Sequence, residues 1–329
     1  MDIQKIVISQ TTEILESNRE NLQNYKFFPV NDKVVMERSL KYVEINYTDF
    51  TNDQIITKSP VWIKYIRSKI NELYEKVYAP IKQDGSRGTY VLVHGSWQAG
   101  FVLENTANYI RKQGYAVYTP TLTGNRPGDD RAIVTLADAN NSLVKYILDL
   151  DLKNVILVGH SSGGMNITGA YDIIPDRISK LVYANGFVPL NGESLLDMCP
   201  DSYKILFKAL AEENNNSVFI PFVIWRQAIM NGADIKTVTN AYNVLNPQPY
   251  QTQSDKLYFK NFNQIAEINI PKAFVNGLQD TALPPSLGWV PRLSDRLGLY
   301  RLIIHPEDHE VLFEKPQLFG QKIIDAARE

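Results

Sequence analysis

One pentapeptide, Gly159 to Gly163, has the pattern Gly-x-Ser-x-Gly and is the segment best suited to carry chemistry. The apolar residues 154–158 before it predict a buried strand, and the small residues 165–171 after it predict a helix. Such a sharp turn holds the central Ser161 in a strained, exposed conformation, where its hydroxyl can act as a nucleophile. Side chains at positions 159 and 163 would collide with neighbouring backbone, which explains the glycines. The alternative is a chance match in a glycine-containing turn. The other residues that this chemistry needs must therefore show whether Ser161 is a nucleophile.

A serine hydroxyl becomes a good nucleophile only when a base takes its proton, and histidine is the usual base. The chain has four histidines, His94, His160, His305 and His309. His94 ends a predicted strand and His160 lies inside the turn itself, which leaves the two late ones. His309 lies several residues beyond the last predicted strand, where a loop can carry it over Ser161. His305 directly ends that strand, and we expect a structural hydrogen bond there. We predict His309 as the general base.

The third group that this chemistry needs is an acid that holds the histidine ring. Asp280 lies on the loop directly after the predicted strand 273–275, which gives the chain order serine, acid, histidine. Its carboxylate would accept the Nδ1 proton and stabilise the imidazolium. One alternative is that Asp280 caps a helix before Pro284. Asp308 is a rival acid, but adjacent residues rarely orient each other's rings well, so we predict Asp280.

Two backbone N–H groups are needed to stabilise the oxyanion, each worth roughly 3 kcal/mol or more. We predict the N–H of Ser162, directly after the nucleophile, and the N–H of Ser96 in the loop after the first predicted strand. Gly95 allows the turn that directs the Ser96 amide inward, and a simple strand-ending turn is the alternative. The residues that we expect to contact the substrate are Gly95, Trp97, His160 and Trp225.

Short apolar runs alternate with helical stretches from residue 89 onward, which predicts parallel βαβ units and an α/β fold. The expected strands, buried on both faces, are residues 90–93, 116–118, 154–158, 180–184, 273–275 and 300–304. The expected helices around them are residues 103–112, 136–150, 165–171 and 317–327. We therefore expect a mostly parallel six-stranded sheet flanked by helices.

The alternation of predicted strands and helices stops between about residues 187 and 270, after the fourth predicted strand. Helical patterns at residues 201–213, 221–230 and 233–245 predict a helical cap over the site. We expect most of the cap's aromatic side chains to pack it onto the sheet, and a minority to line an apolar pocket. These aromatics are Phe207, Phe219, Phe222, Trp225 and Tyr250.

The chain divides into an N-terminal extension, residues 1–84, and an α/β domain, residues 85–329, that contains the cap. The extension is predicted to be mainly helical, because Ser59-Pro60 has the sequence of a helix start. A polar, glycine-containing linker follows at residues 82–88. We expect the extension to pack on the core or to contact a partner, and a homodimer is a further option.

Composition narrows the classes of function. The formal net charge of −2 gives no electrostatic basis for binding nucleic acid or an anionic membrane surface. The single cysteine, Cys199, excludes an internal disulfide and is typical of a reducing compartment. The N-terminus lacks the pattern of a signal peptide, and no apolar run approaches the roughly 20 residues that span a bilayer. We therefore expect a cytoplasmic protein.

From about Gly88 to Ala327 the chain resembles the α/β-hydrolase branch that contains plant methyl esterases, hydroxynitrile lyases and related bacterial esterases. The stretches that carry the resemblance are residues 90–97, 120–124, 159–164, 245–249, 308–309 and 314–316. The resemblance implies the α/β-hydrolase fold, with Ser161, Asp280 and His309 as the triad and the two amides named above as oxyanion donors. It implies no metal and no organic cofactor.

Two residues depart from the hydroxynitrile lyases of this branch. Gly95 stands where they have a threonine, and Glu310 stands where they have a lysine just after the catalytic histidine. That lysine offsets the charge of departing cyanide and a carboxylate would oppose it, so cyanohydrin cleavage is disfavoured. The 1–84 extension is also outside the family's usual plan.

Three hypotheses follow. The first is a serine hydrolase that cleaves a small or medium ester through an acyl-enzyme. The second is a lyase, cyclase or acyl-transfer enzyme with the same pocket, in which the extension recognises a substrate tethered to a carrier protein. The third is a non-enzymatic ligand receptor that retains the pocket.

Overall fold

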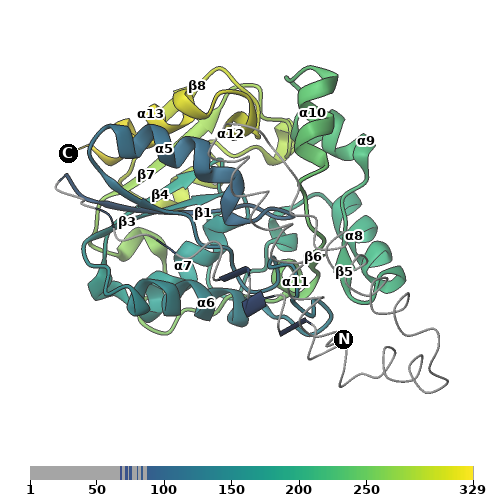
Figure 1. The fold of residues 1–329 in the computed structure, drawn as a ribbon, viewed down its shortest axis with the longest axis horizontal. Coiled ribbons are helices and arrows are strands. Elements are labelled where there is room, and N and C mark those ends of the chain that lie inside the picture. The colour runs from purple at the N-terminus through teal and green to yellow at the C-terminus, as the bar shows by residue number, and fades with distance from the viewer. Residues whose placement is uncertain are drawn as a thin grey trace, which may run out of the picture.

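The structure is a computed structural model that describes residues 67–68, 71–72, 74–75, 80, 83 and 87–328. Its centre is one sheet of six parallel strands in the order β2-β1-β3-β4-β7-β8 (Figure 1). The strands are β1 (Thr89–Val93), β2 (Ala116–Tyr118), β3 (Val155–His160), β4 (Ile178–Ala184), β7 (Lys272–Gly277) and β8 (Arg301–His305). The predicted six-stranded parallel sheet is therefore confirmed.

The strand order reverses direction between β1 and β3. The chain runs outward from β1 to β2 on one side, and from β3 through β4 and β7 to β8 on the other. The loops that follow β1 and β3 therefore leave the sheet in opposite directions and open a crevice at the carboxyl ends of the strands. Both predicted oxyanion donors and the predicted nucleophile lie on these two loops.

Helices cover both faces of the sheet (Figure 1). On one face lie α5 (Glu104–Lys112) and α13 (Pro316–Ala327), and on the other lie α6 (Leu136–Asp149) and α7 (Gly163–Ile173). The short α12 (Val311–Glu314) precedes α13. The short 3₁₀ turns are η1 (Gly100–Leu103), η2 (Pro175–Arg177), η3 (Leu196–Met198), η5 (Ile265–Glu267), η6 (Pro285–Leu287) and η7 (Ser294–Leu297).

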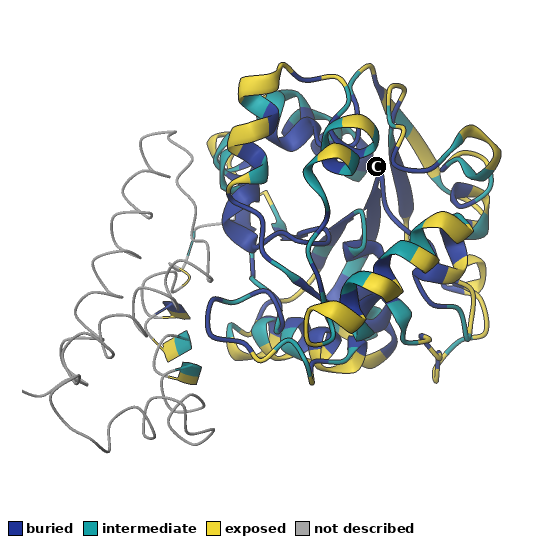
Figure 2. Cartoon of the chain, turned by 90° about the vertical axis from the view of Figure 1, so that its right-hand side faces the viewer, coloured by how far each residue is buried: buried dark blue, intermediate teal, exposed yellow. Residues whose placement is uncertain are grey.

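Burial follows these layers, with dark blue strands between helices whose outer faces are yellow (Figure 2). The inner strands are apolar and buried on both faces, as expected of a covered parallel sheet. The same expectation for β8 is wrong, because this edge strand leaves Leu302 and Ile304 43% and 50% exposed. An edge strand has a neighbour on one side only, so its apolar side chains are less fully covered.

The predicted helical insert lies between β4 and β7 and forms a cap beside the carboxyl ends of the strands (Figure 1). Its helices are α8 (Asp201–Glu213), α9 (Phe222–Ile224) continued by the π-helix η4 (Trp225–Ile229), α10 (Ile235–Tyr242) and α11 (Gln251–Ser254). The cap also contains an antiparallel pair that the sequence analysis did not predict, β5 (Ser217–Val218) with β6 (Gln248–Pro249). Two-residue strands carry too little alternation to be recognised in a sequence.

The predicted helical extension lies almost entirely outside the described residues. Within the extension the structure describes Tyr74, which is buried and whose hydroxyl is 2.8 Å from Thr121 Oγ1. Among the described helices, none is long and apolar enough to cross a membrane.

Candidate active site

Ser161 lies on the turn between β3 and α7 in a left-handed conformation, with a φ of 53°. Residues with a side chain adopt this region rarely, and such strain is typical of functional turns. A Cβ at Gly159 would lie 2.6 Å from the carbonyl carbon and oxygen of Gly163, and one at Gly163 would lie 2.8 Å from the carbonyl oxygen of Val93. The steric reason predicted for both glycines is therefore confirmed.

Asp280 and His309 are brought together from different loops. Asp280 follows β7 and His309 follows β8, and Nδ1 of the imidazole is 2.7 Å from Oδ2 of the carboxylate. The carboxylate is itself fixed, because the Asn185 amide donates to Oδ2 at 2.6 Å and the N–H of Ala282 donates to Oδ1 at 2.9 Å. Both side chains are buried. The geometry is that of an acid that orients a base.

The electrostatics of this pair agree with its geometry. Burial alone would lower the pKa of His309, but Asp280 opposite its Nδ1 raises the pKa above the ordinary value. Burial alone would raise the pKa of Asp280, but His309 and the donated hydrogen bonds hold it below the ordinary value. Each group thus favours the charged form of the other. The arrangement can stabilise an imidazolium that forms transiently.

The rival acid, Asp308, makes other contacts. Its Oδ2 accepts the N–H of Gly232 at 2.8 Å, and its Oδ1 accepts the N–H of Glu310 at 2.9 Å. Asp308 therefore joins its own loop to the cap, while the imidazole of His309 is held by Asp280.

Two further aromatic rings hold His309 in place. Trp289 stacks on the imidazole with ring centroids 5.4 Å apart and an interplanar angle of 15°. His160 Nε2 lies 3.0 Å from the backbone carbonyl of His309, and because a carbonyl can only accept, this nitrogen carries the proton. Burial lowers the pKa of His160 to about 3, so this ring stays neutral. No pattern in the sequence indicates the role of Trp289, which lies 20 residues before His309.

The other two histidines are structural. The N–H of Leu122 donates to Nε2 of His94 at 3.1 Å, which leaves the Nδ1 proton of His94 for the carbonyl of Gly95 at 2.9 Å. His305 is buried against Phe319, and neither of its ring nitrogens has a hydrogen-bond partner among the described residues. The structural hydrogen bond expected for His305 is therefore absent, and packing holds the ring instead.

The predicted oxyanion donors lie on the two loops, after β1 and after β3, that border the crevice. Among the hydrogen bonds of residues 87–328, none uses the backbone N–H of Ser96 or of Ser162, so both amides are available to a ligand. The residue with a left-handed φ in the first loop is Trp97, at 65°, and not Gly95. Gly95 is needed for space instead, because a Cβ there would lie 3.0 Å from the Cβ of Ser161.

A cavity of about 40 Å³ lies under the cap, next to the predicted nucleophile and the predicted base. Ser96, Trp97, Ser161 and His309 all contribute to its wall. Apolar side chains from the cap and from loops that follow the strands make up most of the remainder, among them Phe187, Leu195, Phe207, Ile229 and Leu283. The cavity is thus small, largely apolar and open to both the predicted nucleophile and the predicted base.

Three of the four residues expected to contact the substrate do not line this cavity. Trp225 is fully buried within the cap, where it packs edge-on against Phe313, so its assignment as a substrate contact is wrong. His160 does not reach the cavity, because its Nε2 donates a hydrogen bond to the backbone carbonyl of His309. Gly95 lies beneath His160 and Ser161. Trp97 is the exception, and it contacts Phe207 edge-on at the cavity wall.

Glu310 and Gln98 form a buried pair that the sequence analysis did not place in the site. The Gln98 amide donates to both carboxyl oxygens of Glu310, at 2.8 and 3.0 Å, and its own oxygen accepts the N–H of Gly95 at 3.0 Å. Glu310 also lines the cavity, and burial raises its pKa to about 8. Burial thus favours the neutral, protonated form of the carboxyl group beside His309.

The ligand-type atoms of His160, His309 and Glu310 lie within 4.8 Å of one another. All three side chains already take part in the hydrogen bonds described above. Each side chain thus has a protein partner of its own, and the absence of a metal or cofactor stays a prediction.

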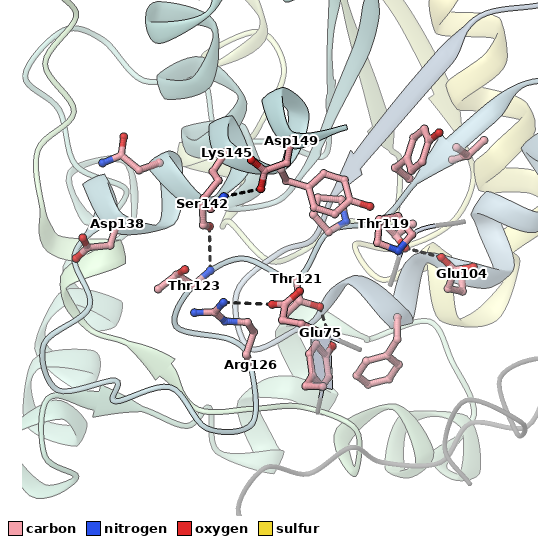
Figure 3. A pocket seen from close by; sticks show the side chains of 18 of the residues that line it. Glu75, Glu104, Thr119, Thr121, Thr123, Arg126, Asp138, Ser142, Lys145 and Asp149 are labelled. Atoms are coloured by element: carbon pink, nitrogen blue, oxygen red, sulfur yellow. Dashed lines mark hydrogen bonds and ion pairs between the residues drawn. The ribbon is translucent and has the colours of Figure 1, made fainter. Parts of the chain in front are cut away.

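A second and larger cavity, of about 1080 Å³, lies along the β2 edge of the sheet, away from the predicted triad (Figure 3). Its charged side chains pair with each other, as Arg111 does with Glu104 at 2.6 Å and Lys145 with Asp149 at 2.5 Å. None of the residues labelled in Figure 3 belongs to the predicted triad or oxyanion loops. Size alone therefore does not identify the site of chemistry.

Fold and site together define an α/β hydrolase. The chain belongs to the alpha/beta hydrolase family, whose model matches residues 90–323. The resemblance predicted from the motifs is therefore confirmed.

Among solved structures, the chain is similar to an extracellular alpha/beta-hydrolase from a Paenibacillus species, described as sharing structural and functional homology with Tobacco Salicylic Acid Binding Protein 2. The TM-score is 0.70 at 34% identity, over 73% of this chain and 99% of the other. A carbendazim hydrolyzing esterase of Nocardioides sp. (strain SG-4G) is 44% identical over 34% of this chain and 47% of its own length. Putative methylesterase 13, chloroplastic, of Arabidopsis thaliana is 24% identical over 79% of this chain and 60% of its own length. The chain thus spans about half to three fifths of these two curated relatives.

Proposed function

We propose that this protein is a serine carboxylesterase that cleaves a small or medium ester through an acyl-enzyme on Ser161. The observation that carries the proposal is the 2.7 Å hydrogen bond between Asp280 and His309, with His309 and Ser161 lining one cavity. The names of the matched relatives, an esterase and a methylesterase, agree with hydrolysis of an ester.

In the proposed mechanism, Ser161 Oγ attacks the ester carbonyl while His309 Nε2 takes the hydroxyl proton. The N–H groups of Ser96 and Ser162 stabilise the oxyanion, and Asp280 stabilises the imidazolium. His309 then gives its proton to the leaving alkoxide, and the alcohol departs. Water attacks the acyl-enzyme with His309 again as base, which releases the carboxylic acid and restores Ser161.

The test is Ser161→Ala, assayed with p-nitrophenyl acetate and p-nitrophenyl butyrate. We expect turnover to fall to the level of the buffer blank, with the circular dichroism spectrum and melting temperature retained. Ser179→Ala is the matched control, because the Ser179 hydroxyl bonds the carbonyl of Asn154 at the opposite end of the sheet. Undiminished hydrolysis by Ser161→Ala would reject the assignment.

A further inference from the structure

Gln253 brings a buried, unpaired polar atom to the wall of the cavity that contains Ser161. Its side chain is 1% exposed and lines the cavity, and its Nε2 donates to Oγ of Ser96 at 3.2 Å. Its Oε1 is fully buried and has no hydrogen-bond partner among the described residues. A buried acceptor without a donor is unfavourable, and at the wall of a cavity an incoming ligand can supply the missing donor.

The backbone holds Gln253 in this position. Gln253 lies in the short helix α11, its N–H donates to the carbonyl of Tyr250 at 2.9 Å, and the preceding Thr252 is also buried. With Nε2 occupied by Ser96, Oε1 is the part of the amide left to face a ligand. The cavity around it is otherwise largely apolar, so a donor that enters gains a bond that few other wall atoms offer.

We propose that Gln253 Oε1 binds the substrate, and that the substrate is an ester whose acyl part carries an O–H or N–H donor close to the carbonyl carbon. This inference rests on the proposed ester hydrolysis. The donor belongs to the acyl part because Gln253 contacts Ser96 on the oxyanion side, whereas the leaving oxygen must face His309 to receive its proton. A site built to accept a hydrogen bond discriminates strongly against an analogue that lacks the donor.

Two p-nitrophenyl esters of equal size test the proposal. The glycolate ester carries a hydroxyl where the propionate ester carries a methyl group. Dividing each kcat/KM by the rate of hydroxide-catalysed hydrolysis of the same ester removes the difference in intrinsic reactivity. After this correction we expect the wild-type protein to favour the glycolate ester by about tenfold or more. A corrected ratio near one would overturn the proposal without any variant.

Gln253→Met keeps the length of the side chain but removes the acceptor. We expect it to lower kcat/KM for the glycolate ester by about tenfold and for the propionate ester by less than about threefold. Gln251→Met is the matched control, because it makes the same change two positions away in α11 with no place in the cavity wall. An equal loss for both esters in Gln253→Met would show a structural role only and would overturn the proposal.

The proposed function and this inference are contradicted by different results. Hydrolysis of neither ester, or hydrolysis that survives in Ser161→Ala, contradicts the proposed function and this inference with it. A second outcome is that both esters are hydrolysed, that hydrolysis depends on Ser161, and that Gln253→Met does not reduce the preference for the glycolate ester. That outcome contradicts the inference alone.

Discussion

The imidazole of His309 is fixed from three directions by groups that are far apart in the sequence. Asp280 holds Nδ1, Trp289 stacks on the ring face, and His160 donates to the backbone carbonyl of the same residue. A ring held in this way needs little reorganisation before it accepts a proton through Nε2. Position along the chain was enough to predict Asp280 and His309, whereas the supporting contacts depend on packing.

Asp280→Asn removes the charge that supports the imidazolium and should lower kcat/KM by about 10³ to 10⁴-fold. In the wild-type protein the pKa of His309 lies above its usual value, so the acid limb of kcat/KM should lie at a higher pH than that of an ordinary histidine. In the variant the burial that remains lowers the pKa, so the acid limb of any residual activity should move to lower pH. The measurement is a pH profile of kcat/KM for both proteins.

Asp308→Asn is the control for that experiment, because Asp308 bonds Gly232 and Glu310 rather than the imidazole. We expect a loss of less than about tenfold and an acid limb that moves less than in Asp280→Asn, because Asp308 contributes less than Asp280 to the raised pKa of His309. Equal losses in the two variants would contradict the role given to Asp280.

Glu310→Gln should make the protein relatively more stable as the pH rises. The pKa of Glu310 is about 8 in the folded protein and about 4.5 in the unfolded chain. Between these values the unfolded chain binds fewer protons, so wild-type stability falls with pH by about 1.4 kcal/mol per unit from this group. The uncharged amide lacks this loss. The measurement is the melting temperature of both proteins at pH 5 and at pH 8. If the melting temperature of Glu310→Gln minus that of the wild type does not increase with pH, the burial of a protonated carboxyl group is contradicted.

At the scale of elements, the cap holds the loop that carries an oxyanion donor. Trp97, with its left-handed φ of 65°, donates its N–H to Gln248 Oε1 at 2.9 Å, and its carbonyl accepts the N–H of Asn246 at 2.6 Å. Both partners belong to the cap segment that contains β6. The neighbouring Ser96 amide is therefore positioned by the cap as well as by the sheet.

Gln248→Met should loosen this connection. The N–H of Trp97 and the amide of Asn125, which donates to the same oxygen at 3.0 Å, both lose a buried acceptor. We expect destabilisation by about 2–4 kcal/mol and a kcat that falls by more than KM rises, because the oxyanion donor acts mainly in the transition state. Urea unfolding and steady-state kinetics measure the two effects. An unchanged kcat in the folded variant would show that the cap does not position Ser96.

The sequence predicted whole elements better than the contacts between them. Helix α8 begins and ends at the predicted residues, Asp201 and Glu213, and β2 matches residues 116–118, because strong periodic patterns are local. The exposed edge strand β8 and the buried Trp225 were misjudged, because each depends on what packs against it. Gln98 and Gln253 carry no sequence signal, since an amide becomes part of a site only through its neighbours.

At the scale of the whole molecule, a parallel sheet and its cap line a small, partly open cavity of about 40 Å³. A cavity of this size suits a short acyl chain unless the cap moves. We therefore expect kcat/KM to fall steadily from p-nitrophenyl acetate to the octanoate. A flat or rising series would show that the size of the cavity does not limit the substrate.

Phe207→Ala should relax this limit, because Phe207 projects from α8 into the cavity wall against Trp97. We expect the octanoate to acetate ratio of kcat/KM to rise by about tenfold, with a loss of stability of about 3–5 kcal/mol. Phe222→Ala is the control, since Phe222 packs on Tyr242 within the cap and does not line the cavity. An equal change in ratio for both variants would assign the effect to general loosening of the cap.

The central claim, that Ser161 is an activated nucleophile, is tested most directly by covalent labelling of the full chain. The protein is incubated with a fluorophosphonate, digested, and mapped by mass spectrometry. The account predicts one adduct, on Ser161, that forms at least about 10³-fold more slowly in His309→Ala. No adduct on Ser161 in the folded wild-type protein, or labelling there that does not depend on His309, would contradict it.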